Sequence, residues 1–73
     1  MPHEMYKDAT ILCKAEFDEV ESLWFLAISI AWQVSEHLHW HTMTPPKSFE
    51  TETEAMAEGF RLAELWVDNK LLG

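Results

Sequence analysis

Three histidines alternate with two bulky apolar residues in the stretch His37-Leu38-His39-Trp40-His41, and their spacing suits metal chemistry best. In a β-strand, side chains two positions apart share a face and stand about 6.6–6.8 Å apart. Two such imidazoles can converge on one zinc ion, with each nitrogen about 2.0 Å from the metal. The third histidine lies too far along the strand to join easily. A zinc site at His37, His39 and His41 is therefore one hypothesis for this pattern, and such a site needs a ligand from elsewhere, such as a second copy of the chain.

The same histidines have two plainer interpretations. Polar side chains on an edge strand discourage pairing with further strands, so three solvated imidazoles would protect the edge of a sheet. Such a row would also make the surface sensitive to pH, because imidazole changes its charge near neutral pH. The solvated edge strand is the interpretation that the sequence favours, with no cofactor bound.

No other part of the sequence has the residue types and spacing of a catalytic or ligand-binding motif. The single cysteine, Cys13, is expected on the core side of the sheet, away from the histidines, where it acts as a small apolar residue. The only glycines are Gly59 and Gly73, so a glycine-rich phosphate-binding loop is absent. The acids of residues 18–21 lack the ligand spacing of a calcium loop. The sequence therefore predicts a protein that is not an enzyme.

Charge and composition exclude several classes of partner. The chain has 73 residues and a net charge of −8, from 13 acidic and 5 basic side chains. The bases are scattered, so neither a nucleic acid nor an anionic membrane is an expected partner. One cysteine cannot form an intramolecular disulfide, and the N-terminal residues lack the pattern of a secretory signal, so we expect a cytoplasmic protein. The charge also admits an acidic decoy that occupies a basic surface of another protein.

The stretch 23–34 organises the fold. Its even positions are large and apolar, whereas its odd positions, apart from Phe25, are small or polar. This alternation predicts a central strand with one face in the core. Residues 9–17 alternate in the same way and predict a neighbouring antiparallel strand. The register that keeps the bulk on one face pairs Phe17 with Trp24, Ala15 with Leu26, Cys13 with Ile28 and Ile11 with Ile30.

A third strand is expected at residues 38–44, with two alternative registers. A three-residue loop would place Trp40 opposite Trp32 in the core and the histidines on the other face. A two-residue loop would place the histidines on the core face instead. We favour the first, because burying a tryptophan is more favourable than burying three imidazoles.

The remaining segments frame the sheet. Residues 1–8 are expected to be a flexible lead-in, and residues 45–51 a linker, because Pro45 and Pro46 end the third strand. A capping box of Thr51 and Glu54 predicts a helix over residues 52–71. Its apolar stripe comprises Ala55, Met56, Gly59, Phe60, Ala63, Trp66, Val67 and Leu71. On this helix Glu58 and Arg61 can pair, and Gly59 permits close approach to the sheet.

These elements predict one α+β domain over residues 1–73, with a three-stranded meander at 9–44 and a helix on one face. The alternative is an all-α helical hairpin, because several apolar residues of 16–38 also fit a helical stripe. The hairpin would leave Leu26 and Ile30 on the wrong face, so the sheet is favoured.

The closing helix resembles that of a group of small uncharacterised bacterial proteins with a β-β-β-α fold. The resemblance lies in the pattern F-x-T-x-x-E-A-x3-G-x3-A-x-x-W-V-D of residues 49–68. It implies the fold, and it assigns no catalytic or binding residue.

The second face of the predicted sheet has nothing to cover it. Antiparallel sheets tolerate one solvated face, but apolar patches often mark interfaces. A flat face of small residues beside Phe25 is one that a second copy can meet. The sequence therefore predicts an interaction module that acts as a homodimer through this face or a sheet edge. The candidate interface residues are Leu12, Phe25, Ala27, Ser29, Ala31 and Met43.

Overall fold

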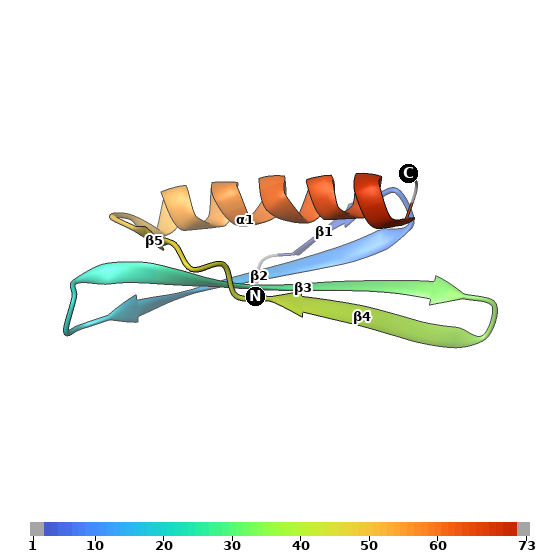
Figure 1. Ribbon diagram of the computed structural model, residues 1–73, viewed down its shortest axis with the longest axis horizontal. Helices are drawn as coiled ribbons and strands as arrows, with labels where there is room; N and C mark the ends of the chain where they lie inside the picture. Colours follow the sequence, from blue (N-terminus) through green and yellow to red (C-terminus); the bar gives the residue numbers. More distant parts are fainter. Residues whose placement is uncertain (1–2, 72–73) are drawn as a thin grey trace.

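The computed structural model describes residues 3–71, which form an antiparallel sheet with one helix packed along it (Figure 1). The elements are β1 (His3–Tyr6), β2 (Ala9–Asp18), β3 (Leu23–Val34), β4 (His37–Met43), β5 (Ser48–Phe49), α1 (Glu52–Trp66) and a π-helical turn, η1 (Val67–Leu71). The strand order is β1-β2-β3-β4, and β5 also pairs with β3. The α+β class is confirmed, with two short strands beyond the three predicted, and the helical hairpin is wrong.

The two longest strands follow the sequence prediction. β3 occupies residues 23–34 as expected, and the pairs Phe17–Trp24 and Ile11–Ile30 have the predicted register. The side chains of Ile11, Ile28 and Ile30 are fully buried. Removing this much apolar surface from water is worth about 1.5–3 kcal/mol for each isoleucine, which fixes the register.

The helix covers β2 and β3 along its predicted stripe. The Thr51 hydroxyl accepts a hydrogen bond from the backbone N–H of Glu54 at 3.1 Å, which confirms the N-terminal cap. Ala55, Ala63 and Val67 are fully buried against the sheet. At Gly59 an added Cβ would lie 2.9 Å from a methyl carbon of Leu26, so the glycine allows the close approach that was predicted.

The predicted flexible lead-in is instead partly strand, although residues 1 and 2 lie outside the described part of the chain. Residues 3–6 form β1, which pairs with β2 through a two-residue turn. Both turn residues, Lys7 and Asp8, have positive φ, as a tight hairpin of this kind requires. β1 has no apolar alternation, because Glu4 points to the helix side, so the pattern did not reveal it.

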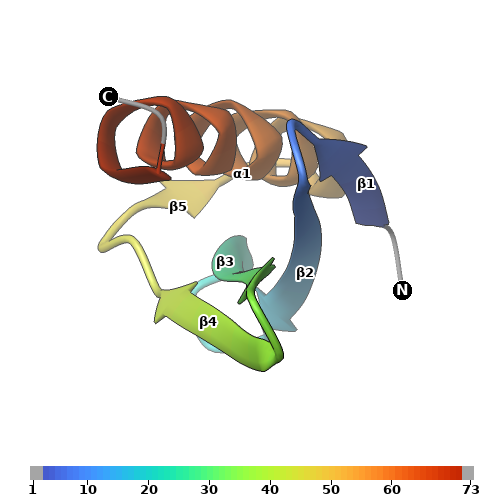
Figure 2. The same ribbon diagram turned by 90° about the vertical axis from the view of Figure 1, so that its right-hand side faces the viewer.

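The predicted register of β4 is wrong. Val34 pairs with His37 and Trp32 with His39, so the loop is the two-residue turn Ser35-Glu36, with Ser35 at φ 56°. The common two-residue hairpin turns have a positive φ at their first loop residue. Their backbone twist matches the twist of the two paired strands. The register therefore places the histidines on the helix side. They are tolerated there because α1 lies over β2 and β3, which leaves β4 outside the deep core (Figure 2).

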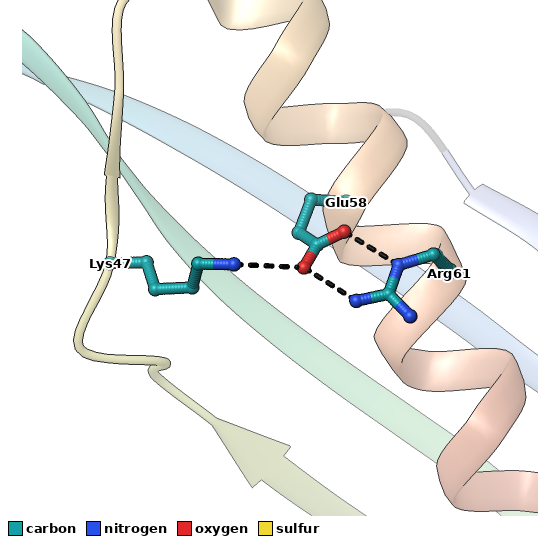
Figure 3. Close-up of polar contacts among 3 residues, drawn as sticks. All are labelled: Lys47, Glu58 and Arg61. Carbon is teal, nitrogen blue, oxygen red and sulfur yellow. Dashed lines mark hydrogen bonds and ion pairs between the residues drawn. The ribbon is translucent and has the colours of Figure 1, made fainter.

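The predicted linker also contains a strand. β4 ends at Met43, before the two prolines, and residues 44–47 then pass Leu26 and Ala27 before β5 resumes the pairing. An ionic cluster holds this segment to the helix: the Glu58 carboxylate accepts from Lys47 at 3.2 Å and from Arg61 at 2.7 Å (Figure 3). These partners lower the pKa of Glu58 to about 2, chiefly through the hydrogen bonds from Arg61.

The molecule is elongated, with extents of 44 × 20 × 18 Å. Seen along its length, the sheet curls beneath the helix, and β1 and β5 approach the helix from its two sides (Figure 2). Within residues 3–71, no helix has both the length and the apolar character needed to cross a membrane.

Candidate functional site

The β4 strand presents its bulky apolar side chains to solvent. The histidines occupy the side of β4 that faces the helix. Leu38 and Trp40 therefore point to the opposite face of the sheet, called the open face, where they are 60% and 68% exposed. Sequence reasoning missed both residues, since Trp40 was expected in the core. The signal that could have found them is the dipeptide Ser35-Glu36, because two-residue loops are the commonest hairpin connections.

The other side chains of the open face are mostly smaller and less exposed. Leu12, Ala27, Ser29 and Ala31 lie on it as expected, and all four are half-buried. Phe25 is 36% exposed at one end of this face. The structure thus places five of the six interface candidates together, but the largest exposed apolar side chains lie on β4.

Met43 is the sixth candidate, and its expected position is wrong. It pairs with Ile28, whose side chain is buried beneath the helix, so Met43 faces the helix and packs against the core. The shift in the β4 register that moved the histidines also moved Met43, because a change of one residue exchanges the two faces of a strand.

Two imidazoles of β4 stack on tryptophans. The His41 ring lies on Trp66 of α1 with ring centroids 4.6 Å apart and planes 8° from parallel. His39 stacks on Trp32 of β3, with ring centroids 5.8 Å apart and an angle of 18° between the ring planes. The ring centroids of the two indoles, Trp32 and Trp66, lie 5.3 Å apart. His37 and His39 are exposed and His41 is half-buried, so this aromatic cluster lies at the margin of the core.

Stacking orients these imidazoles without using their nitrogens. An indole that covers the face of an imidazole leaves the lone pair and the N–H, which lie in the ring plane, free to bind. Within residues 3–71, the side chains of His39 and His41 make no hydrogen bond. Over the same residues, no three His, Cys, Asp or Glu side chains of one chain gather where they could hold a metal ion.

The cysteine lies in the core. Cys13 is fully buried beside Gly59 of the helix, on the core side of the sheet where the sequence placed it. Burial raises the pKa of its thiol to about 11, and the nearby Glu4 carboxylate acts in the same direction. Because the thiolate is the nucleophilic form, this thiol is unreactive at neutral pH.

Two shallow hollows flank residues 44 and 45. One, of about 330 Å³, is on the open face and is lined by Glu16, Phe25, Leu26, Ala27, Thr44 and Pro45. The other, of about 420 Å³, is on the helix side and is lined by Met43, Thr44, Pro45, Leu62 and Trp66. Both form where the chain leaves the edge of β3. Their linings are mainly apolar and bring no acid and base together.

A pair of carboxyl groups joins β1 to the helix. Oε1 of Glu4 is buried and has no hydrogen-bond partner in the described part of the chain. A hydrogen bond between Glu4 and Glu64 needs a proton on one of the two acids. This bond, then burial, then repulsion by Glu64 raise the pKa of Glu4. Nearby, Asp68 accepts hydrogen bonds from Lys7 and Tyr6, which lower the pKa of Asp68, chiefly through Lys7.

No protein-family model, no curated protein and no solved structure matches this chain. The resemblance of residues 49–68 to small bacterial β-β-β-α proteins therefore stays a prediction.

Proposed function

We propose that this protein is a non-enzymatic interaction module that acts as a homodimer, joined edge to edge through β4. The observation that carries the proposal is a free edge strand of seven residues that exposes both Leu38 and Trp40. Long edge strands with exposed apolar side chains pair readily with another chain, and proteins usually blunt them with charge or cover them. Among the described residues, β4 has a neighbour on only one side.

Charge supports a second copy as the occupant of this edge. Each chain carries a net charge of −8, so two copies repel one another over most of their surfaces. Between Ser22 and Phe49, however, Glu36 in the hairpin turn is the only acid. The β3–β4 hairpin is therefore the part of the molecule that a second copy can approach with least repulsion.

The length of β4 selects the register of the dimer. A two-fold axis pairs antiparallel strands so that each contact occurs twice. Only an axis at Trp40, the midpoint of His37–Met43, pairs the whole strand with its mate. In that register Trp40 lies opposite its own copy and Leu38 lies opposite Thr42 of the other chain. Two exposed tryptophans then cover each other on the open face.

Molar mass in solution tests the proposal. In buffer containing EDTA, we expect the wild-type chain to have the mass of a dimer at tens of micromolar. A Trp40→Lys variant places two like charges opposite each other at the axis, which destabilises a strand pair, so it should have the mass of a monomer. The matched control is Val20→Lys, because Val20 is 93% exposed in the turn between β2 and β3.

The control should remain a dimer, since Val20 lies away from β4. A monomeric wild-type chain, or equal masses for the Trp40→Lys and Val20→Lys variants, would contradict association through β4. Circular dichroism should show the same sheet and helix content in all three proteins, because neither substituted side chain is part of the core.

A further inference from the structure

We propose that the homodimer holds one zinc ion on its helix side, bound by His39 and His41 of both chains. This inference rests on the proposed function, because one chain supplies only two of the four ligands. The starting point is the register of β4, which places both imidazoles on the helix side of the sheet. A perpendicular two-fold axis keeps the helix sides of both copies together, so the imidazoles of both chains share one face.

The Trp40-centred register brings the four imidazoles together. It places His39 opposite His41 of the other chain, twice, on either side of the axis. Opposite positions in an antiparallel pair have Cβ atoms about 4.5–5.5 Å apart, and alternate positions on one strand are about 6.6–6.8 Å apart. The four Cβ atoms therefore form a small rectangle, whose centre is about 4 Å from each corner. The distal nitrogen of an imidazole reaches about that far from its Cβ, so the four nitrogens can converge on a zinc ion that lies above the rectangle, about 2.0 Å from each of them.

The chemistry of this arrangement suits zinc. Four neutral imidazole nitrogens satisfy the tetrahedral coordination that structural zinc sites adopt, with Zn–N distances near 2.0–2.1 Å. Imidazole is a ligand of intermediate softness that binds zinc well and magnesium poorly. The charge of −8 on each chain raises the local concentration of cations near the surface.

The surrounding tryptophans hold the ligands in place. Trp66 and Trp32 stack on the faces of His41 and His39, so the rings lose little rotational freedom when a metal binds. Groups that orient the first ligands of a metal contribute substantially to its affinity. His37 lies at the end of β4, where the same register places it opposite Met43 of the other chain. It is outside the rectangle and serves as the matched control.

Native mass spectrometry and calorimetric titration with Zn²⁺ alone test the inference. We expect one zinc ion for every two chains in the wild type and in a His37→Gln variant, with no binding of Mg²⁺. His39→Gln removes two of the four ligands from the dimer. Loss of an outer-shell partner alone weakens metal binding by about tenfold or more, so this variant should weaken zinc binding by more than about tenfold. The exposed position of His39 makes this variant compatible with folding, which circular dichroism verifies.

The outcomes separate this inference from the proposed function. A dimer in EDTA that binds no zinc, or one zinc per chain, or zinc equally well after His39→Gln, overturns the metal site and leaves the dimer intact. A chain that is monomeric both in EDTA and with zinc overturns both. A chain that is monomeric in EDTA and becomes a dimer with one zinc, lost in His39→Gln, supports the metal site and contradicts the metal-free dimer.

Discussion

At the scale of single residues, the most unusual contact is that between two acids. Glu4 faces the helix from β1 and meets Glu64, while its buried Oε1 lacks a donor within residues 3–71. The pair forms its hydrogen bond only when one acid is protonated. Its raised pKa in the fold means that Glu4 contributes stability below its unfolded value of about 4.5, and that this contribution is lost as pH rises through the folded value.

A Glu4→Gln variant should remove this loss. The glutamine amide donates to Glu64 without a titrating proton, so the variant should gain stability relative to the wild type as pH rises from about 4.5 through the raised pKa of Glu4. Urea unfolding at several pH values in this range measures the effect. Glu58, whose pKa is about 2, loses its stabilising contribution only as pH falls below about 4.5, so it does not interfere.

The control for this experiment is Glu19→Gln, because Glu19 is exposed in the turn between β2 and β3. It should follow the wild-type pH dependence. If the stabilities of Glu4→Gln and the wild type change in parallel at every pH above about 4.5, the carboxyl pair does not contribute as described.

At the scale of elements, the contact between α1 and the sheet depends on Gly59. An added methyl would meet Leu26 carbons at 2.9 and 3.2 Å from one side and the Cys13 sulfur at 3.0 Å. Because the contacts come from two buried residues, no single rotamer change relieves them. The glycine therefore sets the distance between the helix and β2–β3.

A Gly59→Ala variant should destabilise the fold by a net amount of about 1 kcal/mol. Overpacking a core costs about 1–3 kcal/mol, and the better helix propensity of alanine returns about 1 kcal/mol. Urea unfolding measures the difference. Ala57→Gly, on the exposed side of the same helix, is the matched change and isolates the propensity cost of about 1 kcal/mol. A Gly59→Ala protein that is more stable than the wild type would contradict the close packing.

The sequence predicts the central elements well and the edges poorly, for one physical reason. β2, β3 and α1 bury one face each, so alternation or a helical stripe shows in their residues, as at Ile11, Ile28 and Ala63. β1 and β4 lie at the edges, where burial is partial. Glu4 and His41 can therefore face the helix, and no hydrophobic pattern specifies their register.

The candidate site was likewise predicted well on the central strands and poorly on the edge strand β4. Leu12, Phe25, Ala27, Ser29 and Ala31 were placed on the open face because the register of β3 is fixed by its core side. Trp40 and Met43 were placed on the wrong faces, because the choice between a two-residue and a three-residue loop at Ser35 decides both. The stacking of His41 on Trp66 joins positions distant in the sequence, which alternation alone cannot predict.

At the scale of the whole molecule, charge and apolar surface are segregated. The acids lie mainly outside residues 22–49, whereas the β3–β4 hairpin exposes Leu38 and Trp40 at a free edge. Pairing of two β4 strands joins these edges and leaves the acidic parts of both chains apart. This segregation favours a symmetric dimer joined at β4.

Disulfide trapping across the interface tests this claim most directly. In the Trp40-centred register, Leu38 of one chain lies opposite Thr42 of the other, at the Cα separation of about 4.5–5.5 Å that a disulfide bridges. The native Cys13 can remain in place, because its thiol is buried and its pKa is raised to about 11. Chains with Leu38→Cys and chains with Thr42→Cys are mixed and oxidised, with Val20→Cys chains as the control.

We predict that the Leu38→Cys and Thr42→Cys chains form a mixed disulfide dimer rapidly. Neither chain should cross-link rapidly with itself, because the two copies of each cysteine would be about 13 Å apart along the paired strands. Mixed dimers that form no faster than those with Val20→Cys, or self-linked dimers that form as fast as mixed ones, would contradict the pairing of β4 about Trp40.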